Sequence, residues 1–176
     1  MVVRKAPDLV RLQDLLDHLG GRLDPRHVAW VVSTLLNLAC YLGWAELTHN
    51  ALSLDTYFVS PPGHRGALLG GWWYAKPAGA RPDALPAPTA LCCPPDILRE
   101  KRADGRTDLE LVRAIGRALL GDAAAPPLLL EWLRPPTAGD PVADYRRWSE
   151  TVLPASFGTG RIAQLDIAAS DLYQEK

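Results

Sequence analysis

HNALSLDTYFV, residues 49–59, joins the strongest helical pattern of the chain to its clearest strand pattern. Upstream, Asp24 and Pro25 supply an N-cap and a first helical residue. From there to about Leu42, apolar residues cover a wide arc, which is typical of a largely buried helix. The sequence therefore predicts a long core helix that leads directly into residues 49–59.

Downstream, the pattern changes from a helical period to short strands. Residues 56–59 (TYFV) and 67–69 (ALL) are strand candidates, and residues 60–66 (SPPGHRG) between them are rich in turn-forming types. This arrangement predicts a small β-hairpin.

The rest of the chain is mostly helical in pattern. Six prolines between residues 76 and 95 predict a long irregular segment, and loops of that length are usually functional or disordered. Further helices are expected over residues 8–19, 107–120, 128–133 and 140–153, with a last helical turn near 168–173. The fold class is therefore mainly α, or α+β with one hairpin, and alternating βαβ units are excluded. We expect one domain over 1–176, with its core at about 9–160 and a tail at 161–176.

Composition narrows the classes of function. The chain has 176 residues and a formal net charge of -1, which gives no electrostatic reason to expect nucleic acid as a partner. We find no signal peptide and no apolar run of membrane-spanning length, so no membrane partner is expected. Cys40, Cys92 and Cys93 match no common zinc spacing, so no metal is expected and reduced thiols in a cytoplasmic protein are predicted.

The order of these elements resembles the C-terminal lobe of a protein kinase. In that family a long helix leads into a catalytic loop of the type H-R-D-x-x-x-x-N, followed by a hairpin, D-F-G, the activation loop and A-P-E. Here the corresponding stretches are residues 49–56, the hairpin, Gly70-Gly71-Trp72, and Pro94-Pro95-Asp96. The resemblance covers roughly residues 9–160 and rests on order and spacing rather than on one motif.

Carried over residue by residue, the resemblance implies a degenerate active site. His49 matches the structural histidine of the loop, but Ala51 stands where the catalytic Asp should be. Thr56 replaces the metal-binding Asn, and Gly70 replaces the Asp of D-F-G. Phosphoryl transfer needs those carboxylates to orient the attacking hydroxyl and to hold the metal. We therefore expect no catalytic residues, no metal and no cofactor. Asp55 would supply a carboxylate only if the register shifted by one residue.

The retained positions are structural ones. Asp96 matches the acid of A-P-E, which in the family pairs with a later arginine, for which Arg134 is the candidate. Asp108 matches a helix-starting Asp that ties down the backbone of the catalytic loop. A simple N-cap is the other role open to Asp108.

The resemblance implies a pseudokinase that serves as a protein-protein interaction or scaffold module. No Gly-rich loop or V-A-I-K lysine precedes residue 9, so either the natural protein lacks an N-lobe or this sequence is part of a longer one. The face that an N-lobe covers in a complete kinase is predicted to bind another protein or a second copy. The residues expected on it are Leu9, Leu12, Leu52, Tyr57, Leu69, Trp72 and Trp73.

Two alternatives remain open at this point. The chain could be half of a phosphotransferase, completed by an N-lobe or by a partner chain. It could also be a non-catalytic module for nucleotides or other small molecules.

Among the aromatic residues, Trp72-Trp73-Tyr74 could either fill the space of the nucleotide or form an exposed anchor. We expect core positions for Trp30, Trp44, Trp132 and Trp148, and solvated positions for His18, His27 and His64.

Overall fold

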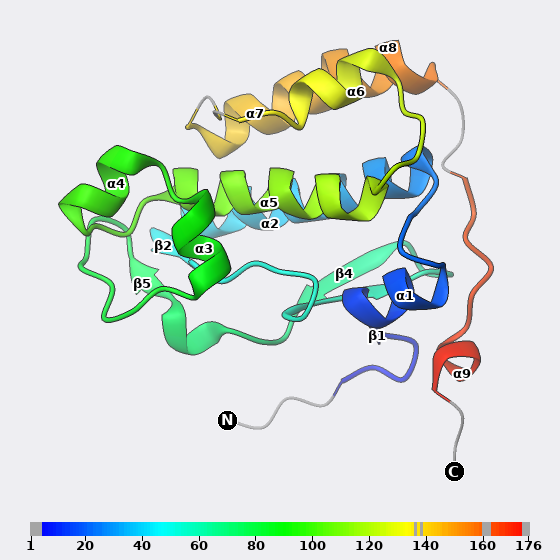
Figure 1. Cartoon of the computed structure of the whole chain (residues 1–176), viewed down its shortest axis with the longest axis horizontal. Coiled ribbons are helices and arrows are strands. Elements are labelled where there is room, and N and C mark those ends of the chain that lie inside the picture. The colour runs from blue at the N-terminus through cyan, green and yellow to red at the C-terminus, as the bar shows by residue number, and fades with distance from the viewer. Residues whose placement is uncertain (1–4, 136, 138, 160–162, 174–176) are drawn as a thin grey trace.

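Two long helices form the centre of the molecule. The computed structural model describes residues 5–135, 137, 139–159 and 163–173. In it, α2 (Pro25–Trp44) and α5 (Gly105–Leu120) lie side by side (Figure 1). Asp24 caps α2 by accepting a hydrogen bond from the backbone N–H of Arg26. Because α2 packs against α5 and against the layer above, its apolar face is in the core, although its length and composition would also suit a membrane span.

A second layer of helices covers one side of this pair (Figure 1). It consists of α6 (Pro127–Trp132), α7 (Pro141–Arg147), a turn of π-helix at Trp148–Val152, and α8 (Leu153–Phe157). Asp140 caps α7 as the sequence predicts.

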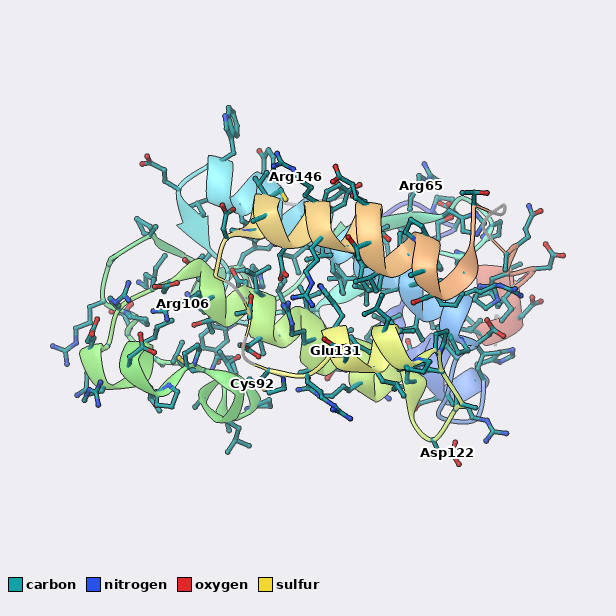
Figure 2. The ribbon with its side chains drawn as sticks, turned by 90° about the horizontal axis from the view of Figure 1, so that it is seen from above. Arg65, Cys92, Arg106, Asp122, Glu131 and Arg146 are labelled. Atoms are coloured by element: carbon teal, nitrogen blue, oxygen red, sulfur yellow. The ribbon has the colours of Figure 1, made fainter. Side chains whose placement is uncertain are left out.

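Seen from above, the labelled arginines Arg65, Arg106 and Arg146 are spread over the molecule and do not gather on one face (Figure 2).

Two small sheets and two short helices lie on the other side. One antiparallel sheet has the order β1 (Val10–Arg11), β3 (Tyr57–Ser60), β4 (Arg65–Leu68), and it includes the predicted hairpin. The other pairs β2 (Leu47–Thr48) with β5 (Lys76–Pro77). These sheets hold both ends of the segment that follows α2. The remaining elements are α1 (Leu12–His18), the 3₁₀ turn η1 (Trp72–Tyr74), α3 (Ala87–Cys92), α4 (Pro95–Glu100) and α9 (Ala169–Leu172).

The mainly α fold class is confirmed, with four local corrections. Residues 8–11 are not helical, because Val10 and Arg11 pair with β3. α5 begins at Gly105, two residues before the predicted start, while α2 ends at Trp44, close to its predicted end at about Leu42. The last long helix continues past residue 153, through the π-helical turn to Phe157.

The fourth correction concerns the proline-rich segment. It contains α3, a helix that starts beside a proline and was not predicted. Of the expected tail, residues 161–162 and 174–176 lie outside the described part of the chain.

Core predictions for the aromatic residues are mostly confirmed. Trp30, Trp132 and Trp148 are buried, and the ring centroids of Trp132 and Trp148 are 4.5 Å apart. The prediction for Trp44 is wrong, because this residue ends α2 and its ring packs against the exposed Tyr41. His18 is exposed as expected, whereas His27 and His64 are half-buried; the ring of His64 packs edge-on against Trp30.

Candidate functional site

The segment after β2 is held by a buried carboxylate. Asp108, on the first turns of α5, accepts hydrogen bonds from the backbone N–H groups of His49 (2.7 Å) and Asn50 (2.8 Å). It does not cap its own helix, because Asp104 is the N-cap and accepts from the N–H of Arg106. Burial raises the pKa of Asp108 to about 6, against the opposing effect of the two N–H donors. Of the two roles open to Asp108, the structure shows contact with the residue 49–50 backbone.

His49 links this segment to the loop after the hairpin. Its Nε2 lies 3.0 Å from the carbonyl oxygen of Gly70, which can only accept, so Nε2 carries a proton. Burial lowers the pKa of His49 to about 4, which favours the neutral ring at neutral pH. The ring of Trp72 packs edge-on against His49, with centroids 5.0 Å apart.

Ala51, Thr56 and Gly70 pack closely on one another. Ala51 is buried, and its carbonyl accepts a hydrogen bond of 2.8 Å from the Thr56 hydroxyl. The same hydroxyl oxygen accepts from the backbone N–H of Ser53 at 3.0 Å. The Thr56 hydroxyl is therefore occupied by bonds inside its own loop. We call His49, Ala51, Thr56, Gly70 and Gly71 the closed loop cluster.

Packing leaves little room for a side chain at Gly70 and less at Gly71. A Cβ atom placed on Gly70 would lie 3.3 Å from both Cα and Cγ2 of Thr56. Gly71 has a φ of 78°, and a Cβ there would approach Cε1 of His49 to 2.8 Å. Real Cβ atoms rarely tolerate such distances, so glycine is required at 71 both by its conformation and by its neighbours.

Possible metal ligands and the Asp55 carboxylate both bear on the chemistry of this cluster. In the described part of the chain, no group of three or more His, Cys, Asp or Glu side chains could hold a metal ion. Asp55 is exposed and forms an ion pair of 3.2 Å with Arg11. Its carboxylate therefore faces solvent and a surface arginine, outside the closed loop cluster.

Asp96 forms an ion pair, but with a different arginine from the candidate. Its carboxylate accepts a hydrogen bond of 2.7 Å from Arg106, which holds the pKa of Asp96 below its usual value. The proposed partner Arg134 is therefore wrong. The reason is local: Asp96 on α4 and Arg106 at the start of α5 face each other across one short turn.

The predicted interface is much smaller than expected. Leu52 and Tyr57 are 2% exposed, and Leu9 and Leu12 are also buried, so these four belong to the core. The ring of Tyr57 occupies the space that Gly66 leaves open, since a Cβ at Gly66 would overlap its hydroxyl. Leu69 is half-buried.

Two tryptophans remain exposed on that side. Trp72 is 44% exposed and Trp73 is 75% exposed. The indole N–H of Trp72 donates to the carbonyl of Leu68 at 3.1 Å. Trp72 is thus fixed in place by this bond and by the His49 ring, with one side open to solvent.

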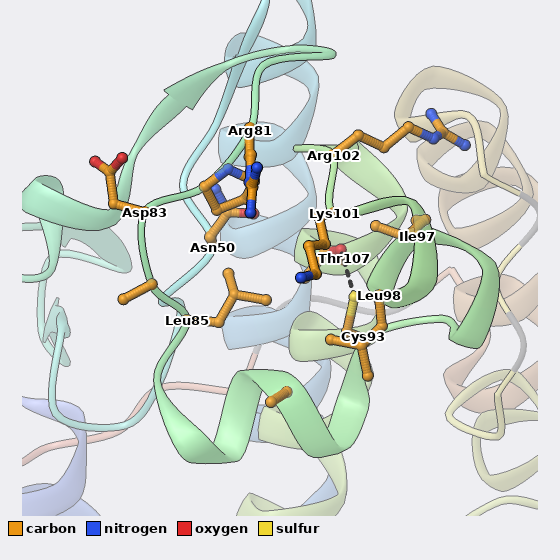
Figure 3. Close-up of a pocket in the computed structure, with 13 residues that line it drawn as sticks. Asn50, Arg81, Asp83, Leu85, Cys93, Ile97, Leu98, Lys101, Arg102 and Thr107 are labelled. Carbon is orange, nitrogen blue, oxygen red and sulfur yellow. Dashed lines mark hydrogen bonds between the residues drawn. The ribbon is translucent and has the colours of Figure 1, made fainter.

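A feature that sequence reasoning missed lies behind the closed loop cluster. A cavity of about 580 Å³ is lined by α3, α4, the start of α5 and residues 81–85 (Figure 3). Asn50 contributes to its wall, and Thr89 beside it donates to the carbonyl of Asn50 at 2.8 Å. The prolines between 76 and 95 marked this segment as unusual, but they gave no signal for a cavity.

No family model matches this chain, and a search of curated proteins found no similar sequence. The interpretation of the site therefore rests on the geometry described above.

Proposed function

We propose that this chain is a kinase-like C-lobe without phosphotransfer activity and that it acts as a protein-binding module in the cytoplasm. Two contacts support the resemblance: Asp108 on the backbone of residues 49–50, and His49 on Gly70. The first of these is the tie expected between the helix-starting Asp and the catalytic loop. The three cysteines are free, as is usual for proteins of the reducing cytoplasm.

The single observation that best supports an inactive site is the close packing of the closed loop cluster. Transfer of a phosphoryl group requires carboxylates that position the nucleophile and the metal. Ala51 and Gly70 offer none, and the Thr56 hydroxyl is bonded within its loop. A phosphotransferase half completed by another chain would need these positions to be open, whereas Thr56 packs directly on Gly70.

The exposed tryptophan pair supports the binding role. Aromatic residues often contribute most of the energy of an interface, and rigid ones lose little entropy when a partner binds. Trp72 is already fixed by Leu68 and His49, and Trp73 next to it projects into solvent. We propose that Trp73, supported by Trp72, inserts into an apolar pocket of a partner protein or of a second copy.

The experiment replaces Trp73 with a photo-crosslinking phenylalanine analogue and uses Trp44 as the matched control. Both residues are highly exposed, but Trp44 lies at the end of α2, on a different element. We expect a discrete cross-linked product in native host extract, or a cross-linked dimer, from position 73 only. The product should disappear when Trp72→Ala is added. Equal products from both positions, or none from position 73, would contradict the binding role.

Catalytic activity is tested separately. Purified protein with Mg²⁺ and labelled ATP should transfer no more phosphate to itself or to generic substrates than a heat-treated control. Transfer that is lost in Asp55→Asn would instead support an active site with a shifted register.

A further inference from the structure

The cavity between α3 and α4 has the size and lining of a small-molecule site. Its volume of about 580 Å³ lies within the range of about 300–1,000 Å³ that is usual for such sites. Leu85, Ile97 and Leu98 supply an apolar wall, and the buried Thr107 and Cys93 lie 3.5 Å apart at its inner end (Figure 3). The lining thus combines apolar walls with a few polar atoms.

The charges around the cavity do not cancel. Asp83 is engaged by Lys76 at 2.6 Å, and Arg102 is engaged by Glu100 and Asp104 at 2.6 Å each. Arg102 also points away from the cavity, whereas the Lys101 side chain points into it (Figure 3). Within the described residues, neither Lys101 nor Arg81 forms a salt bridge. Two uncompensated cations therefore lie on the lining.

Backbone hydrogen bonds tie together the two segments that carry these cations. The N–H of Gly79 donates to the carbonyl of Ala103 at 2.8 Å, and the N–H of Ala103 donates to the carbonyl of Ala80 at 2.7 Å. This pair of bonds ties the segment that carries Arg81 to the segment that carries Lys101. Lys101 itself has a φ of 53°, a conformation that a residue other than glycine adopts at an energetic cost. The backbone of the rim is therefore held by bonds within the protein, while the Lys101 and Arg81 side chains are exposed to solvent.

We propose that this cavity binds a small organic anion, with a carboxylate or phosphate head between Lys101 and Arg81 and an apolar body against Leu85, Ile97 and Leu98. Charge-assisted hydrogen bonds from lysine and arginine are the usual means of holding such heads. A bare inorganic ion would bind more weakly than such a molecule, because it makes no apolar contact with this wall. This site is separate from the tryptophan pair, so either proposal can fail while the other stands.

The test uses octanoate as the probe, with octylamine and inorganic phosphate as matched compounds. Isothermal titration calorimetry of the whole chain should show saturable binding of octanoate at one site. Octylamine should bind at least tenfold more weakly, because Lys101 and Arg81 repel its ammonium group. Phosphate should also bind at least tenfold more weakly, because it lacks the apolar body.

Variants locate the site. Lys101→Met and Arg81→Gln should each weaken octanoate binding about tenfold, because each removes one charge-assisted contact. Ala90→Leu should weaken it further by filling the cavity. Arg99→Gln, on α4 two residues before Lys101 but outside the lining, is the control and should leave the affinity unchanged. Circular dichroism and thermal unfolding confirm that each variant is folded.

Three outcomes would overturn the proposal. They are no saturable binding of octanoate, equal binding of octanoate and octylamine, and octanoate binding that is unchanged in folded Lys101→Met, Arg81→Gln and Ala90→Leu.

Discussion

The closed loop cluster and the cavity between α3 and α4 meet at one segment, yet they are built in opposite ways. In the cluster, the Thr56 hydroxyl and the proton-bearing nitrogen of His49 both find partners inside the protein, and glycines let the chain segments touch. In the cavity, Lys101 and Arg81 face an open volume. Asn50 lies in the wall of the cavity and directly follows His49 of the cluster.

The contrast between the two regions indicates where a ligand can bind in this chain. A kinase-like site that lost only its carboxylates would leave a polar, open cleft. In the closed loop cluster the space is filled as well, because Thr56 packs on Gly70 and His49 packs on Gly71. The neighbouring segment keeps both charge and volume, and it is there that we infer a ligand.

The largest expected effect comes from removing the carboxylate that supports both regions. Asp108→Ala would leave the buried N–H groups of His49 and Asn50 without partners and would create a cavity. We expect a loss of about 3–5 kcal/mol in the free energy of unfolding, measured by urea denaturation.

Asp140→Ala is the matched control for that substitution. Asp140 also accepts from two backbone N–H groups, but at an exposed helix cap, so its loss should be about 1 kcal/mol. Equal losses for the two variants would mean that burial of Asp108 does not matter, and the account of the closed loop cluster would fail.

The second prediction concerns pH. Burial raises the pKa of Asp108 to about 6, so its contribution to stability grows as pH falls from about 6 to about 4. Burial lowers the pKa of His49 to about 4, so its contribution is lost as pH falls from about 6.5 to about 4. Each group changes the free energy of unfolding by about 3 kcal/mol over this pH range, and the two changes have opposite signs.

Two variants separate these opposing contributions. Between pH 6 and pH 4, Asp108→Asn should lose about 3 kcal/mol more than the wild-type protein, and His49→Gln should lose about 3 kcal/mol less. Urea unfolding at several pH values gives both differences. Three parallel stability curves would show that these two groups do not titrate as their burial requires.

A smaller effect tests how tightly the cluster is closed. Gly71 and Gly79 have nearly the same φ, 78° and 80°, so an alanine at either position costs about 1 kcal/mol for the backbone alone. A Cβ at Gly71 would also press on His49 and Ala51, whereas nothing lies within 4 Å of one at Gly79.

We therefore expect Gly71→Ala to destabilise the protein by about 1 kcal/mol more than Gly79→Ala does, measured by thermal unfolding. An equal loss at both positions would indicate that the cluster is loose enough to admit a side chain.

The sequence allowed prediction of features that depend on nearby residues. Asp24-Pro25 and Asp140-Pro141 located the starts of α2 and α7, and the turn residues 60–66 located the hairpin. Prediction failed where distant segments decide the outcome. The pairing of Val10 with Val59 replaced a helical turn, and Asp104, four residues before Asp108, turned out to be the cap of α5.

The candidate site was predictable as a set of residues but not as a surface. Their separation along the sequence selected His49, Ala51, Thr56 and Gly70 as candidates, and these residues lie together in the structure. Burial of Leu52 and Tyr57 depends on how the hairpin packs, and the cavity depends on the fold of residues 79–103, which no local pattern specifies.

A titration of ¹⁵N-labelled protein with Mg²⁺ and ATP, followed by amide chemical shifts and by the melting temperature, shows whether the closed loop cluster binds nucleotide. A ligand at 100 times its dissociation constant adds about 2.7 kcal/mol, which moves the melting temperature of a protein of this size by several degrees. We predict no saturable shift at the amides of Ala51, Thr56, Gly70 and Gly71 and no rise in the melting temperature. Saturable shifts at those amides, together with a rise of several degrees, would contradict a closed and inactive site.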